Sequence, residues 1–412
     1  MAGLKEVVVI DVVRSAIGKS GRKGMEKGGQ LCQASAQDLL AATMRSLLDR
    51  VKANNPRFDE GLIEDVIVGC LSQIGEQGGN IARMTSLLAG IPKTASAFTI
   101  NQYCNSGLKA INTAARAIKV GDGDAFVCSG VELMSHYGMG SDIQVALQAK
   151  YPVRMTSRMA QTGMTVPQGV CAEMISADHK HTREELDTFG AWSMKKCVEA
   201  QRKGWYADHI VPFEFTWENQ AYRVEKDETL RPKAADDWDG FLQDLATLKP
   251  PFKPEGGMVT AGNSSQIVDG AAACLLMSAD KAEELGMEPL ARILGMASAG
   301  GEPVPMLLAP IPAVQKALAR AGKKIDDMDV IEPNEAFVSP LLVFADELGY
   351  DRMDPRINPT GGAVGLGHPI GASGIVYFGE MVHHLKRTKG RAGLQMLCGG
   401  GGIGIATVVE RV

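Results

Sequence analysis

Short apolar runs alternate with stretches of helical apolar spacing along most of the chain. Residues 7–13 and 66–70 are typical of buried strands, whereas 36–51 and 81–89 carry apolar residues at helical spacing. This alternation predicts an α/β protein with a mostly parallel, buried sheet. Residues 130–260 interrupt the pattern because they are rich in Met, Gln, Lys and Arg. We interpret them as an inserted, loop-rich subdomain.

An internal repeat relates the two ends of the chain. Residues 63–67 resemble residues 327–331, and a predicted helix follows later in each half. Each helix precedes a short apolar strand, which contains Cys128 in the first half and Cys398 in the second. These ordered matches predict two halves of similar topology. The apolar positions of the two helices have the same spacing: Leu108, Ile111, Ala115 and Ile118 in one, and Ile375, Phe378, Val382 and Leu385 in the other.

Composition narrows the classes of protein. Hydrophobic residues make up 45% of the chain and charged residues 22%, which is enough apolar material for a large core. The net charge of −5 disfavours a dedicated nucleic-acid binder. No apolar run has the length of about 18 residues that a membrane span needs. The N-terminal segment resembles neither a signal nor a transit peptide, so we expect a cytoplasmic protein.

The cysteines are scattered and none forms a C-x-x-C pair, which argues against a zinc site and a disulfide framework. This usage is typical of a reducing compartment, where most thiols are buried and one or two can be reactive. The eight cysteines are Cys32, Cys70, Cys104, Cys128, Cys171, Cys197, Cys274 and Cys398.

Cys104 lies in the segment NQYCNSG, just before a predicted helix. The small polar residues after it suit a helix N-cap. A cysteine at a helix N-terminus feels the positive end of the helix dipole, which favours the thiolate. Cys104 is therefore a candidate nucleophile, and a buried structural cysteine is the alternative.

His368 lies in a glycine-rich segment, residues 358–371, and precedes Pro369 and a predicted helix. Glycine allows the backbone to approach a bound molecule closely. Histidine is a suitable base for a cysteine, so His368 is a candidate catalytic base. The alternative is a loop histidine that caps a neighbouring element.

Two further segments carry candidate chemistry. Cys398 precedes glycines 399–402, whose backbone N–H groups suit the stabilisation of an oxyanion. The glycine spacing also fits G-x-G-x-x-G, but the strand that follows in place of a helix argues against a dinucleotide site. Asn334 and Glu335 follow a predicted buried strand, where α/β folds often place reactive groups, although a helix cap explains them equally well.

Together these segments resemble the thiolase family, and the resemblance extends from about residue 5 to the end. It implies an α/β thiolase fold of two repeated αβαβα-type halves in five layers, with an inserted loop domain. The motifs occur in the family's order: N-x-x-C-x-S-G at 101–107, N-E-A-F at 334–337, G-H-P at 367–369 and C-x-G-G-G at 398–402. The expected parts are an N-terminal half at 1–129 completed by about 245–275, a CoA-binding insertion at 130–260, and a C-terminal half at 276–412.

The resemblance also implies roles for single residues. Cys104 is expected to become acylated, His368 to activate it, and Cys398 to exchange a proton with the acetyl-CoA methyl group. Asn334 would hold an ordered water that, together with His368, stabilises one thioester oxygen, and the backbone N–H groups of Cys104 and Gly400 would stabilise the other. The residues expected to contact CoA or the acyl chain are Ser265, Met306, Phe337 and Arg231.

Thiolases cleave 3-ketoacyl-CoA with CoA into acetyl-CoA and a shortened acyl-CoA, or run the reverse condensation. The resemblance therefore implies an acyltransferase that uses CoA as substrate, needs no metal or redox cofactor, and forms a homodimer or homotetramer. Fatty acid β-oxidation is one pathway that fits. A thiolase-like protein that binds acyl-CoA without turnover is the alternative. The segment 153–168 lacks the His-Met pair of short-chain biosynthetic thiolases, and its Met155, Met159 and Met164 would suit a broader acyl pocket.

Overall fold

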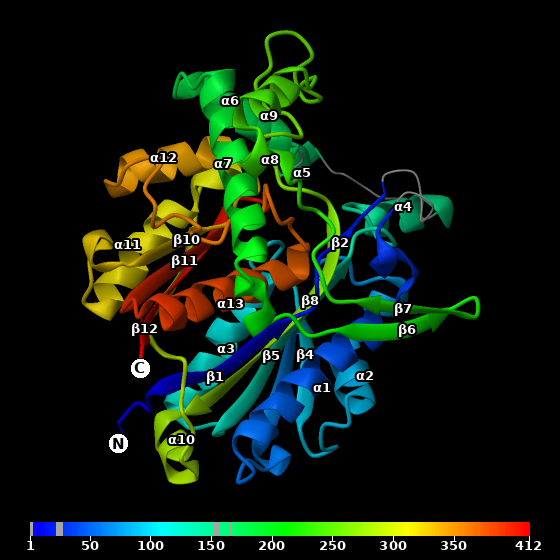
Figure 1. The fold of residues 1–412 in the computed structure, drawn as a ribbon, viewed down its shortest axis with the longest axis vertical. Coiled ribbons are helices and arrows are strands. Elements are labelled where there is room, and N and C mark those ends of the chain that lie inside the picture. Colours follow the sequence, from blue (N-terminus) through cyan, green and yellow to red (C-terminus); the bar gives the residue numbers. More distant parts are fainter. Residues whose placement is uncertain (1–2, 22–27, 151–156, 165) are drawn as a thin grey trace.

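The strands form a ten-stranded mixed sheet and a separate two-stranded hairpin (Figure 1). This computed structural model describes residues 3–21, 28–150, 157–164 and 166–412. The strands are β1 (Val7–Arg14), β2 (Gly18–Lys19), β3 (Ile63–Gly69), β4 (Ser96–Ile100), β5 (Ala125–Leu133), β6 (Phe213–Trp217), β7 (Gln220–Val224), β8 (Val268–Ser278), β9 (Ala291–Gly300), β10 (Val330–Pro333), β11 (Ala392–Gly399) and β12 (Ile403–Arg411).

The helices include the four segments predicted from the apolar spacing. The helices are α1 (Ala36–Asn54), α2 (Ile81–Leu88), α3 (Ser106–Val120), α4 (Ser141–Gln148), α5 (Ser157–Gln161), α6 (Gln168–Asp178), α7 (Arg183–Arg202), α8 (Lys233–Asp236), α9 (Trp238–Ala246), α10 (Ala279–Leu285), α11 (Pro310–Ala321), α12 (Val338–Leu348) and α13 (Ile370–Thr388).

The sheet confirms the internal repeat. Its strand order is β10-β11-β12-β9-β1-β8-β5-β3-β4, and β2 pairs with β8. In the N-terminal half β5 pairs parallel with β3 and antiparallel with β8, and in the C-terminal half β11 pairs parallel with β10 and antiparallel with β12. In the C-terminal half, a parallel bridge between Ile331 and Ile357 corresponds to the pairing of β3 with β4 in the N-terminal half. The halves meet through a short pairing of β1 with β9.

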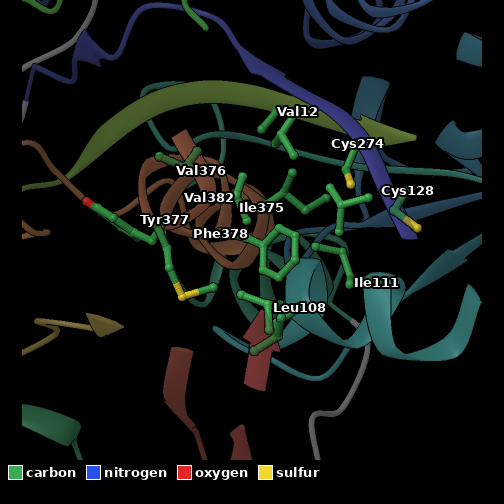
Figure 2. Close-up of a cluster of buried hydrophobic side chains, with 14 of the residues drawn as sticks. Val12, Leu108, Ile111, Cys128, Cys274, Ile375, Val376, Tyr377, Phe378 and Val382 are labelled. Carbon is green, nitrogen blue, oxygen red and sulfur yellow. The ribbon is translucent and has the colours of Figure 1, made fainter. Parts of the chain in front are cut away.

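Helices cover both faces of each half, which explains the long apolar runs of the strands. The central layer consists of α3 and α13, which pack on each other and on strands of both halves. Figure 2 shows Leu108 and Ile111 of α3 beside Ile375 and Phe378 of α13, in one apolar cluster. Helices α1 and α2 cover the outer face of the N-terminal half, and α11 and α12 cover that of the C-terminal half. The five layers of the predicted thiolase fold are therefore present.

Glycines let α3 and α13 approach each other closely at their N-termini. A Cβ atom at Gly374 would lie 2.1 Å from the backbone nitrogen of Leu108, and one at Gly107 would lie 2.9 Å from the carbonyl oxygen of Gly371. No side chain fits such gaps. The residues just before the two helices, which include Cys104 and His368, are consequently held near each other.

The insertion differs from the loop-rich subdomain expected for residues 130–260. Nearly half of its described part is helical, with α7 as its longest helix, and β6 and β7 form a hairpin. Helix α7 was missed because its exposed face is strongly polar, although the capping box formed by Thr182 and Glu185 marks its start. Strand β5 also extends to Leu133, beyond the expected boundary at residue 129. The division into three parts itself stays a prediction.

Within the described ranges, no helix is both long and apolar enough to cross a membrane. Among the same residues, no group of three or more His, Cys, Asp or Glu side chains is arranged to hold a metal ion.

Candidate active site

Cys104 lies in a tight turn between β4 and α3. The hydroxyl of Ser106 accepts a hydrogen bond from the backbone of Gln102 at 2.8 Å and donates one to the carbonyl of Tyr103 at 2.6 Å. Tyr103 adopts a positive φ of 54°. This turn buries Cys104, whose residue is 5% exposed, next to Ile370 at the start of α13.

The structure contradicts the expected thiolate at Cys104. Burial raises the pKa of this thiol well above its usual range, and the neighbouring Cys398 raises it further. A hydrogen bond with Gln168 lowers the pKa, but burial outweighs it. The resting thiol of Cys104 is therefore neutral, and a base must remove its proton before the sulfur can act as a nucleophile.

His368 immediately precedes the N-terminus of α13. Its Nδ1 lies 2.6 Å from the hydroxyl of Ser373, and its backbone N–H donates to the carbonyl of Gln266 at 3.1 Å. Its Nε2 is buried and has no hydrogen-bond partner among the described residues. Burial lowers the pKa of His368 to about 4, so the imidazole is neutral near pH 7. Nε2 is thus the ring atom free to exchange a proton.

Cys398 lies at the end of β11, where the chain turns into β12. Gly401 and Gly402 have φ angles of 74° and 77°, which glycine adopts without strain. A Cβ atom at Gly402 would lie 2.5 Å from the carbonyl oxygen of Glu302. Cys398 is buried, and burial raises the pKa of its thiol to about 12.

The turns that carry the two thiols are in direct contact. The side-chain amide of Asn105 donates to the carbonyl of Ile403 at 3.3 Å. A Cβ atom at Gly399 would lie 2.9 Å from the amide nitrogen of Asn105, and one at Gly400 would lie 3.2 Å from the ring of Tyr103. The neighbours of Cys104 therefore rest on the neighbours of Cys398.

Asn334 joins the same region. Its backbone N–H donates to the carbonyl of Met396, two residues before Cys398, at 2.9 Å. Both polar atoms of its side chain are buried without a hydrogen-bond partner in the described part of the chain. Such groups cost stability unless a ligand completes them. A substrate or an ordered water would complete Asn334.

Glu335 connects the strand end to the glycine-rich segment before His368. Its carboxylate accepts hydrogen bonds from Asn358 at 2.6 Å and from the backbone N–H of Val364 at 2.9 Å. It also accepts one from Ser193 of α7 at 2.6 Å. Glu335 therefore positions the segment that carries His368. From the sequence alone, a helix cap explained this residue equally well.

Three of the four expected substrate contacts lie around this centre. Met306 and Phe337 belong to an apolar cluster with Cys398 and with residues of α6. The backbone N–H of Ser265 donates to the carbonyl of Ala336 at 3.0 Å. Arg231 lies farther out, exposed on the insertion, at a small pocket that Gln266 also lines.

Sequence reasoning missed several residues of the site. His368 contacts Ser373, and Glu335 contacts Ser193. Cys104 contacts Gln168, which comes from the first turn of α6 in the insertion. Of the expected methionines, Met164 reaches the glycine turn, where its sulfur would lie 2.3 Å from a Cβ atom at Gly401. Met155 and the side chain of Met159 lie outside the described residues.

Comparison with known proteins gives consistent results. Residues 7–280 match the thiolase N-terminal domain and residues 287–411 the thiolase C-terminal domain. Two proteins named 3-ketoacyl-CoA thiolase, from Alcanivorax borkumensis and a Marinomonas species, are each 42% identical over 411 residues. The alignments cover 99% of this chain and 99% and 98% of the relatives.

A solved structure also resembles the fold of this chain. The crystal structure of the Bacillus anthracis acetyl-CoA acetyltransferase matches with a TM-score of 0.86 and 32% identity, and the alignment covers 100% of both chains. With two domain matches that span nearly the whole chain and full-length relatives above 40% identity, this protein belongs to the thiolase family and is an acyltransferase.

Proposed function

We propose that this site cleaves 3-ketoacyl-CoA with CoA into acetyl-CoA and a shortened acyl-CoA, and catalyses the reverse condensation, through an acyl group on Cys104. The observation that carries the proposal is the contact between the turns of two buried thiols, Cys104 and Cys398, beside the free Nε2 of His368. The names of the full-length relatives support the same substrate.

In the first half-reaction, Cys104 gives its proton to Nε2 of His368, and its sulfur attacks the 3-keto carbon. The bond between C2 and C3 then breaks, and the electron pair on C2 takes the proton of Cys398, which releases acetyl-CoA. Two thiols are needed because the nucleophile and the acid at C2 act at different atoms.

In the second half-reaction, the thiol of CoA gives its proton to the Cys398 thiolate, and its sulfur attacks the acyl group on Cys104. The acyl-CoA leaves, and His368 returns its proton to Cys104. Negative charge develops on a thioester oxygen in both steps. His368 with Asn334, and the backbone N–H groups of Cys104 and Gly400, are the donors that we propose for these oxygens.

The acylated enzyme is the direct test. Intact-protein and peptide mass spectrometry after incubation with a 3-ketoacyl-CoA should show an acyl adduct on Cys104. Folded protein that binds CoA and leaves Cys104 unmodified would favour the binding protein without turnover.

A variant separates the roles of the two thiols. Cys398→Ala should still accept an acyl group on Cys104 from an acyl-CoA but should fail in carbon–carbon bond cleavage and formation. Normal thiolysis by this variant would remove the proton-transfer role from Cys398.

We propose that the apolar cluster around Cys398, which includes Met306, Phe337 and residues of α6, receives the acyl chain, and that Ser265 and Arg231 contact CoA. Such a pocket suits fatty acid β-oxidation. Rates of CoA-dependent cleavage across 3-ketoacyl-CoA substrates of increasing chain length test this. A preference for the shortest substrate would contradict it.

We also propose a cytoplasmic homo-oligomer, either a dimer or a tetramer. All eight cysteines are free, which suits a reducing compartment. Strand β4 forms an end of the sheet, and Phe98 of β4 and Leu88 of α2 are 37% and 58% exposed. An open edge with apolar side chains favours pairing with a second copy. Sedimentation of the wild type as a monomer would refute this assembly.

A further inference from the structure

Glu132 is a fully buried carboxylate that the catalytic scheme does not use. It lies near the end of β5, and its only polar contacts in the described residues are with uncharged N–H donors. One oxygen accepts from the backbone of Leu71 at 2.9 Å and of Gly371 at 3.0 Å. The other accepts from the backbone of Ser72 and the side chain of Gln77, both at 3.0 Å. A buried carboxylate is costly unless it is held in this way.

The four donors come from both halves of the molecule. Leu71, Ser72 and Gln77 belong to the segment after β3 in the N-terminal half, whereas Gly371 lies in the first turn of α13, three residues after His368. That turn reads Ile-Gly-Ala-Ser, so the helix has no acidic residue of its own there. Burial raises the pKa of the Glu132 carboxyl, but its four N–H donors favour the ionised form, which supplies the negative charge that helix N-termini favour.

The segment after β3 also borders Cys104 on both sides. The backbone N–H of Cys70 donates to the carbonyl of Ile100, and the side chain of Asn101 donates to the carbonyl of Leu71, both at 3.2 Å. A Cβ atom at Gly69 would lie 2.6 Å from the backbone nitrogen of Gly107 and 2.7 Å from the carbonyl oxygen of Gly371.

We propose that Glu132 is a positioning residue for the reaction: its carboxylate holds the first turn of α13, and with it His368, against the segment that borders Cys104. It does not act on the substrate, because both oxygens are occupied. This inference rests on the roles proposed above for Cys104 and His368.

The test compares Glu132→Gln, Glu132→Asp and a matched control. Displacement of catalytic groups by about 1 Å costs about 100-fold in rate. We therefore expect Glu132→Gln to lower kcat for thiolysis about 100-fold and to change KM less than about threefold. Glu132→Asp keeps the charge and should recover at least a tenth of the wild-type kcat. The control is Glu410→Gln, which alters another buried carboxylate, at the end of β12 away from Cys398, that accepts hydrogen bonds from Arg292 and Lys323.

A second readout is the pH dependence of Cys104 alkylation by iodoacetamide. The groups that act on this thiol are Cys398, Glu132 and Gln168, and His368 lies at the adjoining helix start. The negative charge of Glu132 raises the pKa of Cys104, so Glu132→Gln should move the alkylation midpoint to lower pH. Glu410→Gln should leave the midpoint unchanged.

Equal losses of kcat in Glu132→Gln and Glu410→Gln, or a midpoint that stays in place, would reduce Glu132 to a fold-stabilising role. If Glu132→Gln does not fold, Gln77→Met removes one of the four donors and should lower kcat about tenfold at constant KM. An unchanged kcat there overturns the proposal. Retained thiolysis in Cys104→Ala would instead overturn the proposed function, independently of Glu132.

Discussion

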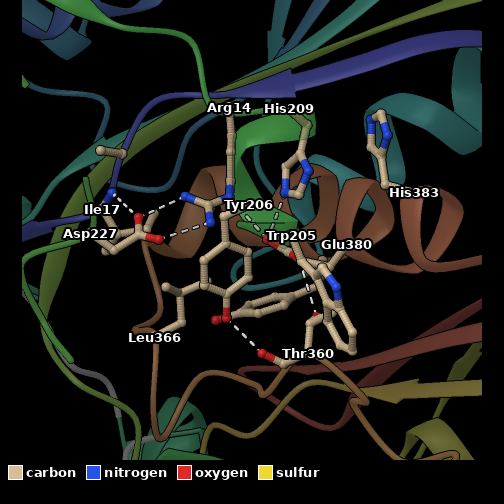
Figure 3. A network of polar contacts seen from close by, with 12 residues as sticks. Arg14, Ile17, Trp205, Tyr206, His209, Asp227, Thr360, Leu366, Glu380 and His383 are labelled. Atoms are coloured by element: carbon tan, nitrogen blue, oxygen red, sulfur yellow. Dashed lines mark hydrogen bonds and ion pairs between the residues drawn. The ribbon is translucent and has the colours of Figure 1, made fainter. Parts of the chain in front are cut away.

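Two buried polar regions of this molecule are built in opposite ways. Around Arg14 the guanidinium is fully paired: Asp227 binds both terminal nitrogens at 2.7 and 3.0 Å, and Glu380 accepts from Nε at 3.0 Å (Figure 3). Around Cys104, by contrast, Nε2 of His368 and both amide atoms of Asn334 lack partners in the described part of the chain. Both regions are nearly inaccessible to solvent.

The difference separates polar groups that pair with each other from polar groups that keep their hydrogen-bonding capacity for a ligand. Arg14 comes from β1, Asp227 from the insertion and Glu380 from α13, so their ion pairs fix three parts of the molecule together. Burying such charges is tolerable only when each has a partner. His368 and Asn334 keep their hydrogen-bonding capacity for a substrate, and this reduces the stability of the empty enzyme.

The largest expected effect is on the nucleophile. Cys104→Ser should lower kcat/KM for thiolysis by at least about 10⁴-fold, because a serine in this neutral, buried site is a far weaker nucleophile. The melting temperature should change little. Steady-state kinetics together with thermal unfolding check both parts. If Cys104→Ser retained more than about 1% of wild-type activity, Cys104 would not be the nucleophile.

In the paired region the expected effect is on stability. Glu380→Gln leaves Arg14 without one carboxylate and removes the charge that faces His209 at 2.8 Å. Breaking a buried pair typically costs about 3–5 kcal/mol of unfolding free energy. Urea unfolding measures this loss, and kcat at a temperature where the variant is folded should stay within a few-fold of wild type. A stable Glu380→Gln variant without activity would show that Glu380 acts in the reaction and does not mainly stabilise the fold.

Asn334→Ala sharpens the comparison from the catalytic side. Removing one preorganised donor to a developing oxyanion costs about 2.7–4 kcal/mol of barrier, so kcat should fall about 10²–10³-fold. Because the amide atoms of Asn334 lack partners, the free energy of unfolding should stay equal or rise. A destabilised variant with near-normal kcat would show that Asn334 is structural.

The two regions also respond to pH in different windows. Burial lowers the pKa of His368 from its ordinary value near 6.5 to about 4, so the unfolded chain binds a proton between these values that the fold does not. Stability contributed by the neutral ring is therefore present above pH 6.5 and is lost as the pH falls toward 4, on the order of 3 kcal/mol in total.

For Glu380, His209 and Arg14 outweigh the effect of burial and lower the pKa to about 2, so its contribution is present above pH 4.5 and is lost only below that value. Urea unfolding of wild type and His368→Asn at pH 7, 5.5 and 4.5 checks the assignment. The variant should lose less stability than wild type over this range. Parallel pH profiles would show that His368 is not buried as a neutral ring.

The smallest expected effect concerns a surface pair. Arg202 and Asp236 form an ion pair at 2.8 Å, but their side chains are 49% and 55% exposed. Exposed pairs contribute little because water and salt screen them. Arg202→Ala should leave the unfolding midpoint and kcat unchanged, which makes it a control for Glu380→Gln. A clear loss of stability in Arg202→Ala would contradict the expected difference between buried and exposed ion pairs.

Much of the fold and the main site residues could be predicted from the sequence. The spacing from Leu108 and from Ile375 predicted the two central helices. The resemblance to the thiolase family implied that Cys104, His368 and Cys398 act in one site. The contacts of Glu132, Ser373 and Gln168 could not be predicted, because they join positions far apart in the chain or depend on which polar residues are buried. For the same reason the predicted direction of the Cys104 pKa was wrong.

The walls of the site and its reactive groups come from separable stretches of sequence. Helix α6 and Met164 belong to the insertion, whereas Cys104, His368, Asn334 and Cys398 follow or precede elements of the central sheet and its helices. Because Gln168 contacts Cys104, exchanging only residues 169–178 between homologous enzymes would test whether this wall sets chain-length selectivity while Cys104 keeps that contact. In this architecture, the range of substrates can change in evolution while the reactive groups stay the same.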